Sequence, residues 1–302
     1  MERRRSHAGL VGAALALGLA VTAAAAPLMN WPDLLGRPMP RPTETIAYGP
    51  GPMQFGDLWL PAGKGPFPVV LMVHGGCWRS RVAKLTIMNY AAADLARRGI
   101  AVWNIEYRGV DVAGGGYPGT FADVEAAADA LPAIAAKHHL QIERVVALGH
   151  SAGGHLVFWL AARPSLPRTS PLWRTHPLPI AGVVSLGGLP DLEDAHARGD
   201  EACGADTVER LVGPPGPAHA DVYADTSPAA LRLTSPAVQI SGDQDPIATP
   251  DSATRFAERM HGRARQPILT EVVSRSGHVE LIAPGSDAWA AAVLATERLL
   301  GR

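Results

Sequence analysis

The chain has 302 residues, 47% hydrophobic and 18% charged, so it is long and apolar enough to build a substantial buried core. Its 32 glycines and 27 prolines follow no fixed period, which excludes a collagen-like chain and indicates many tight turns. A net charge of -1, with basic residues clustered only at the extreme N-terminus, disfavours binding to nucleic acid, which requires a basic face.

The first 26 residues have the pattern of a secretory signal peptide. Three arginines at positions 3–5 precede an apolar run, 8–26, which ends in small residues suited to signal peptidase. We predict cleavage after residue 25 or 26. The alternative is an uncleaved membrane anchor, but the run is mostly Ala and Gly, which insert weakly. The sequence therefore predicts an exported protein, periplasmic or secreted, whose mature domain spans 27–302 without stable membrane insertion.

Strand-like and helix-like segments alternate along the rest of the chain, after a Pro-rich stretch at 30–41 that is expected to wrap the surface. This βαβα order predicts an α/β fold with a mostly parallel central sheet and helices on both faces. The predicted strands are 43–48 and 55–60, which form an antiparallel pair, then 69–73, 100–105, 144–148, 180–186, 237–240 and 268–273. The predicted helices are 82–98, 121–138, 151–162, 251–261 and 286–300.

The stretch 189–235 has no strong strand pattern, contains Pro and Gly, and includes one predicted helix at about 206–212. We expect it to be a small insert that covers the active site. Because substrate choice depends on the loops around a site, the sequence does not reveal the substrate.

Residues 149–153 read Gly-His-Ser-Ala-Gly and fit the pattern G-x-S-x-G between a predicted strand and a predicted helix. In that context the serine lies on a sharp, strained turn that exposes its hydroxyl, and small neighbours let the strand and the helix pass closely. The helix N-terminus favours developing negative charge. We predict that Ser151 is a nucleophile; the alternative is a chance Gly/Ser turn.

Residues 74–78, His-Gly-Gly-Cys-Trp, follow the predicted strand 69–73. Acyl transfer requires donors aimed at the oxyanion of a tetrahedral intermediate, and backbone N–H groups in a glycine-rich turn can supply them. We predict an oxyanion hole formed by the N–H groups of Gly76, Cys77 and Ala152. The alternative is a Gly-Gly turn after an ordinary parallel strand.

A carboxylate and a histidine follow the last two predicted strands. Asp245 is the preferred acid, Asp243 competes with it because it could instead cap the turn, and Asp191 is a weaker candidate. His278 lies in the loop after the final strand, where it can take the serine proton while the acid fixes its tautomer. The order Ser, Asp, His is the one expected for such a hydrolase fold.

The 11 histidines show no spacing such as H-E-x-x-H, so we predict no catalytic metal. Acyl transfer by a serine, a histidine and an aspartate requires no cofactor, so we expect none. The chain contains two cysteines, Cys77 and Cys203. In an exported protein two cysteines can pair, and we hypothesise a disulfide that ties the oxyanion loop to the covering insert.

From about residue 55 to the C-terminus, the chain resembles the α/β-hydrolase superfamily. Within it, the chain is most similar to the small carboxylesterase and kynurenine formamidase (arylformamidase) group and to bacterial feruloyl/acetyl esterase-like domains. The family pattern places the acid where Asp245 stands. The resemblance is carried by residues 74–78, 149–155, 242–245 and 277–282.

The resemblance implies an α/β-hydrolase fold and hydrolysis of a small-molecule carboxylic ester or N-formyl amide through an acyl-enzyme. The formamidase pattern often has an aromatic residue where Cys77 stands, and tryptophan catabolism is cytoplasmic, so the ester is preferred. Peptidases of the prolyl-oligopeptidase type share the domain, but this chain is too short for their propeller. An acyltransferase and an inactive fold used for binding are further alternatives. The sequence sets no oligomeric state.

Overall fold

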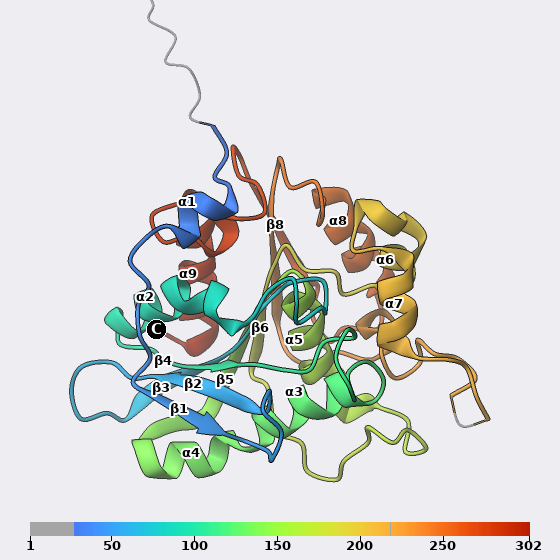
Figure 1. Ribbon diagram of the computed structural model, residues 1–302, viewed down its shortest axis with the longest axis horizontal. Coiled ribbons are helices and arrows are strands. Elements are labelled where there is room, and N and C mark those ends of the chain that lie inside the picture. The colour runs from blue at the N-terminus through green and yellow to red at the C-terminus, as the bar shows by residue number, and fades with distance from the viewer. Residues whose placement is uncertain (1–26, 218) are drawn as a thin grey trace, which may run out of the picture.

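The computed structural model describes residues 27–217 and 219–302; the predicted signal peptide, 1–26, lies outside the described residues. One eight-stranded sheet runs through the molecule in the order β1-β2-β4-β3-β5-β6-β7-β8 (Figure 1). The pairs β1–β2 and β2–β4 are antiparallel, and all later neighbours are parallel. The strands are β1 (Glu44–Ala47), β2 (Phe55–Trp59), β3 (Phe67–Val73), β4 (Ala101–Ile105), β5 (Leu140–His150), β6 (Gly182–Leu186), β7 (Ala237–Gly242) and β8 (Leu269–Val273).

Helices cover both faces of this sheet (Figure 1). The central strand β3 is buried on both sides: Val69, Leu71 and Val73 pack into one apolar cluster, and Val70 and Met72 into the other. Successive strand residues point to opposite faces, so a continuous apolar run is what such a strand requires. The helices are α1 (Trp31–Leu35), α2 (Asn89–Arg97), α3 (Gly119–Asp129), α4 (Leu131–His138), α5 (Ala152–Ala162), α6 (Leu192–Arg198), α7 (Ala205–Val212), α8 (Pro250–Arg259) and α9 (Asp287–Leu300).

The sequence-based predictions find every strand, but two long helices are wrong in detail. The predicted helix 121–138 is two helices, α3 and α4, because Pro132 in the first turn of α4 cannot donate the backbone hydrogen bond that would continue α3. The predicted helix 82–98 begins only with a 3-10 turn at Leu85–Met88, followed by α2. The backbone N–H of Leu85 donates instead to the carboxylate of Glu106. Helices α1 and α6 are not predicted.

None of the helices in the described part of the chain is both long enough and apolar enough to cross a membrane.

Candidate active site

Ser151 lies on the turn between β5 and α5, with backbone angles φ 55° and ψ -121°. A residue other than glycine adopts this conformation at a cost of about 1–3 kcal/mol, and only where its surroundings enforce it. Here the Ser151 N–H donates to the carbonyl of Leu186 at the end of β6 (2.8 Å), which fixes the turn against the neighbouring strand. The strained turn predicted from the G-x-S-x-G pattern is therefore present.

Two glycines allow α5 to approach β5 and β3 this closely. A Cβ atom on Gly149 would lie 2.1 Å from the carbonyl oxygen of Gly153, and one on Gly153 would lie 2.1 Å from the carbonyl oxygen of Val73. Both distances are far below van der Waals contact, so the outer glycines of the motif are required by the packing around Ser151.

Asp245 and His278 form a buried pair. Nδ1 of His278 donates to Oδ2 of Asp245 over 2.6 Å, and Oδ1 of Asp245 accepts from the backbone N–H groups of Ile247 (2.9 Å) and Ala248 (3.0 Å). Two backbone N–H groups in the loop after β7 and the imidazole of His278 thus hold the carboxylate in place. With Nδ1 carrying the proton, Nε2 is the ring nitrogen that remains to act as a base.

The other two candidate carboxylates have structural tasks. Asp243 is exposed, and its Oδ1 accepts from the backbone N–H of Ser276 (3.1 Å). Donors from the loop around Ser276 lower the pKa of Asp243. Asp191 caps the N-terminus of α6 and forms an ion pair with Arg259 (2.9 Å). Of the three, Asp245 is the carboxylate that the structure brings to His278.

The loop after β3 carries the predicted oxyanion donors. Gly76, Cys77 and Trp78 all have positive φ angles, 107°, 52° and 52°, so the chain coils tightly beside Ser151. Among the described residues, no backbone hydrogen bond uses the N–H of Gly76, Cys77 or Ala152 as a donor. These three N–H groups therefore have no backbone acceptor within the described part of the chain.

A buried contact between a histidine and a glutamate supports this loop on the side of β4. Nε2 of His74 contacts Oε1 of Glu106 at 2.9 Å, and its Nδ1 donates to the carbonyl of Gly75 at 2.6 Å. Burial alone would raise the pKa of Glu106, but the His74 ring and the backbone N–H groups of Leu85 and Tyr107 outweigh it, so this pKa lies below its usual value. Glu106 therefore stays charged and fixes the start of the loop.

Cys77 and Cys203 form a disulfide, with their Cα atoms 5.3 Å apart. The hypothesis that these cysteines pair agrees with the structure. Cys203 lies just before α7, so the bond connects the oxyanion loop to the segment 189–235 across 126 residues of sequence.

A pocket of about 380 Å³ opens onto Ser151 and His278. This places the predicted nucleophile, the predicted base and the loop residues Gly76 and Cys77 around one cavity. Sequence reasoning missed most of the apolar wall, and the predicted covering segment 189–235 contributes none of the lining residues identified among the described residues. The other lining residues are Trp31, Leu35, Val82, Ala83, Ile87, His150 and Ile247.

His150 lines this pocket between Gly149 and Ser151 and is completely buried. Its Nε2 donates to the carbonyl of His278 (3.0 Å). Burial, with a further contribution from the nearby His278 ring, holds the pKa of His150 well below its usual value. His150 is therefore neutral at pH 7 and helps to position the His278 backbone.

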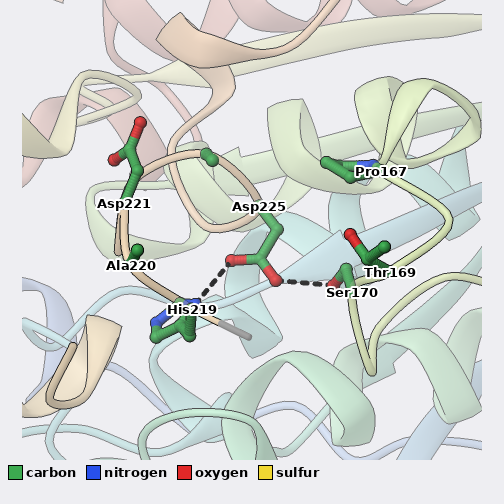
Figure 2. A pocket seen from close by; sticks show the side chains of 8 residues that line it. Pro167, Thr169, Ser170, His219, Ala220, Asp221 and Asp225 are labelled. Carbon is green, nitrogen blue, oxygen red and sulfur yellow. Dashed lines mark hydrogen bonds and ion pairs between the residues drawn. The ribbon is translucent and has the colours of Figure 1, made fainter. Parts of the chain in front are cut away.

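A second group of Ser, Asp and His side chains borders a smaller cavity of about 110 Å³ (Figure 2). The hydrogen bonds within this group differ from those of a catalytic triad. Asp225 is central: it accepts from Ser170 (2.5 Å) and pairs with His219 (3.3 Å) (Figure 2). Asp225 also accepts from the hydroxyl of Tyr117 (2.8 Å). Ser170 donates to the carboxylate and not to the imidazole, so the order of contacts is not the Ser–His–Asp order of a catalytic triad. This cluster instead anchors the loop that follows α7.

No cluster of His, Cys, Asp or Glu side chains within residues 27–217 and 219–302 has the geometry to hold a metal ion.

The BD-FAE family model matches residues 57–260 of the chain. None of the curated proteins matches the sequence. Several solved structures share the fold. Esterase B from Lactobacillus rhamnosis, in complex with an inhibitor, is 19% identical, with a TM-score of 0.69 over 87% of this chain and 88% of that one.

A truncated carbohydrate esterase from gut microbiota is 18% identical, with a TM-score of 0.69 over 86% of this chain and 97% of the other. The esterase Est2 from Thermogutta terrifontis, a Planctomycetes species, is 20% identical, with a TM-score of 0.67 over 85% and 91% of the two chains. At these identities the likeness shows the fold, and the prediction of an α/β-hydrolase fold is confirmed.

Proposed function

The chain belongs to the BD-FAE family of α/β-hydrolase-type esterases, and on that premise we propose that it hydrolyses a carboxylic ester through an acyl-enzyme on Ser151. The observation that carries the proposal is the Asp245–His278 hydrogen bond beside a pocket that also contains Ser151. This supplies a nucleophile, a base and an orienting acid, in the chain order expected for the fold.

In the first half-reaction, Oγ of Ser151 attacks the ester carbonyl carbon while Nε2 of His278 takes the hydroxyl proton. Asp245 keeps the other ring proton on Nδ1 and stabilises the imidazolium that forms. The C–O bond to the alcohol then breaks, and His278 gives its proton to the leaving alkoxide. The products are the alcohol and an ester of Ser151.

The charge that develops on the carbonyl oxygen is stabilised by the free N–H groups of Gly76, Cys77 and Ala152. Ala152 is the first residue of α5, so the partial positive charge of the helix N-terminus acts at the same place. In the second half-reaction, water attacks the acyl carbon, His278 accepts its proton, and Ser151 leaves with that proton. No cofactor takes part in this scheme.

The site of action is proposed to lie outside the cytoplasm. The signal-peptide pattern of residues 1–26 supports this, and so does the Cys77–Cys203 disulfide, since disulfides persist mainly in oxidising compartments. Expression of the full chain in a Gram-negative host tests it: the protein should appear in the periplasmic fraction with a mature N-terminus at residue 26 or 27. Full-length protein in the cytoplasm would refute the proposal.

The activity is tested with p-nitrophenyl esters from acetate to decanoate, comparing the wild type with Ser151→Ala. We expect hydrolysis by the wild type and a loss of at least about 10³-fold in the variant, since removal of a nucleophile has effects of this order or larger. A fluorophosphonate should add one equivalent to the wild type and none to the variant by intact mass. Equal rates in the two proteins would contradict the assignment of Ser151.

A further inference from the structure

One wall of the active-site pocket comes from the N-terminal segment, far from the catalytic motifs in sequence. Trp31 and Leu35 of α1 line the pocket together with Ser151 and His278. The BD-FAE family model matches only 57–260, so this wall lies outside the region that it describes. Any substrate preference that Trp31 and Leu35 create therefore comes from the N-terminal segment and not from the region that the family model matches.

The segment is held in a defined position. A capping box closes the start of α1, with Asn30 and Asp33 exchanging side-chain-to-backbone hydrogen bonds of 3.1 and 2.8 Å. Leu34, on the opposite side of α1 from solvent, is completely buried in the apolar cluster beneath. After the helix, Tyr90 of α2 donates to the carbonyl of Arg37 (2.8 Å). A wall fixed at these points can discriminate between substrates by shape.

Glu280 attaches the segment to the loop of the catalytic histidine. One carboxylate oxygen of Glu280 accepts the backbone N–H of Met29, and the other accepts the N–H of Gly277 (3.0 Å), next to His278. Trp31 in turn packs edge-on against the ring of His150, with centroids 6.1 Å apart. The wall therefore keeps a constant position relative to the reacting atoms.

The chemistry of the wall is apolar. Leu35 is 40% exposed and Val82, which also lines the pocket, is 61% exposed, so both present hydrocarbon to the pocket and to the solvent. Large apolar side chains that stay exposed indicate a ligand-binding surface when they gather at a cavity. The volume of about 380 Å³ is near the lower end of the range for small-molecule sites, about 300–1,000 Å³.

We propose that Trp31 and Leu35 are specificity-determining residues that bind a compact apolar group of the ester substrate. This inference rests on the proposed function, since it concerns the same pocket. The apolar group that these residues bind is an alkyl or aryl group, which can belong to either the acyl or the alcohol half of the ester. Each methylene that contacts such a wall changes kcat/KM by about 10-fold or more.

The test is a selectivity series for the wild type, Trp31→Ala, Trp31→Phe and Leu35→Ala. One arm varies the acyl group (p-nitrophenyl acetate, butyrate and hexanoate), and the other varies the alcohol (ethyl, butyl and phenyl acetate). In one arm, the ratio of kcat/KM for the larger to the smallest ester should fall about 10-fold in Trp31→Ala and less in Trp31→Phe. The arm that responds identifies the half of the substrate that is bound.

Met39→Ala is the matched control, because Met39 lies in the same segment, is 45% exposed and is not among the pocket-lining residues. It should keep the wild-type ratios. Leu35→Ala guards against misfolding as an explanation, since truncating an exposed side chain leaves the core intact. Unchanged ratios in both arms for Trp31→Ala and Leu35→Ala, with folded protein by circular dichroism, would overturn the inference while leaving the esterase proposal standing.

A second readout does not depend on turnover. The rate at which p-nitrophenyl phosphonates label Ser151 is followed by intact mass, with methyl, butyl or hexyl placed either on phosphorus (the acyl position) or on the ester oxygen (the alcohol position). In the arm that responds with esters, the butyl-to-methyl ratio should fall in Trp31→Ala. If no ester is hydrolysed but labelling occurs, these ratios decide the inference. If Ser151 is neither acylated nor phosphonylated, the proposed function and the inference both fail.

Discussion

Asp245 accepts the Nδ1 proton of His278 over 2.6 Å, whereas Asp243, two residues earlier, holds a backbone N–H of the same histidine loop. The two carboxylates thus act on the same loop through different groups: one binds the imidazole and the other the main chain. Substituting each carboxylate in turn should therefore have different effects on the rate of ester hydrolysis.

Replacing Asp245 with Asn should reduce kcat for ester hydrolysis by about 10³–10⁴-fold, because an amide does not enforce the Nδ1-protonated tautomer of His278. Asp243→Asn is the matched control and should stay within about 10-fold of the wild type. Steady-state kinetics with p-nitrophenyl butyrate measures both. Similar losses in the two variants would mean that the acid has been assigned to the wrong carboxylate.

Removing the disulfide should destabilise the fold. Cys203→Ser breaks the link across 126 residues, and the loss of a native disulfide costs about 2–5 kcal/mol in the free energy of unfolding. Urea titration of the wild type with and without dithiothreitol, beside the variant, measures the change. Reduced wild type should resemble the variant, and the variant should not respond to reductant; a wild type that is indifferent to reductant would argue against the bond.

Stability should decrease as the pH falls below neutrality, in part because of His155. Its Nδ1 accepts from the indole N–H of Trp78 (3.2 Å) and its Nε2 donates to the carbonyl of Thr226 (2.9 Å). Burial lowers the pKa of His155 from 6.5 to about 4, and the contact with Thr226 offsets this only in part. Between these values the unfolded chain binds a proton that the folded chain does not.

The contribution of His155 is therefore complete above about pH 6.5 and is lost as the pH falls toward 4, at about 1.4 kcal/mol per pH unit. His155→Gln should remove this part of the slope when urea stability is measured from pH 7 to pH 4. His261→Gln, at an exposed position, should retain the wild-type slope. If the slopes of His155→Gln and wild type coincide, His155 does not titrate in this way.

Glu280→Gln should loosen the N-terminal segment. A glutamine has one acceptor oxygen in place of two, so either the N–H of Met29 or that of Gly277 loses its partner. An unsatisfied buried N–H costs about 1–3 kcal/mol, and limited proteolysis should cut earlier near residues 28–37. Glu271→Gln, on the exposed face of β8, is the control and should be cleaved like the wild type.

The strands of the sheet and the candidate catalytic residues follow from local patterns, whereas the order of the strands was not predicted. Strand β3 is an unbroken apolar run, and Ser151, Asp245 and His278 each follow a strand, so that periodicity and turn residues are enough to place them. The choice between Asp245 and Asp243 needed either the family pattern or the hydrogen bonds, because both carboxylates occupy one turn.

The apolar wall could not be predicted in this way. Trp31 and Leu35 belong to a five-residue helix inside a Pro-rich stretch, whose position depends on long-range contacts such as that of Met29 with Glu280. The start of α2 was missed for a similar reason, since the partner of the Leu85 N–H is Glu106 on another part of the chain. Pairings between residues distant in sequence leave no periodic pattern.

The pocket is closed by opposite ends of the polypeptide: Trp31 lies near the start of the described chain, and His278 belongs to its last loop before α9. During synthesis, the proposed nucleophile Ser151 is made well before either His278 or the contacts of Glu280 exist. A nascent or truncated chain would contain Ser151 without its base, and α1 would lack its attachment to Glu280. Hydrolytic activity would thus begin only when the whole domain has been assembled.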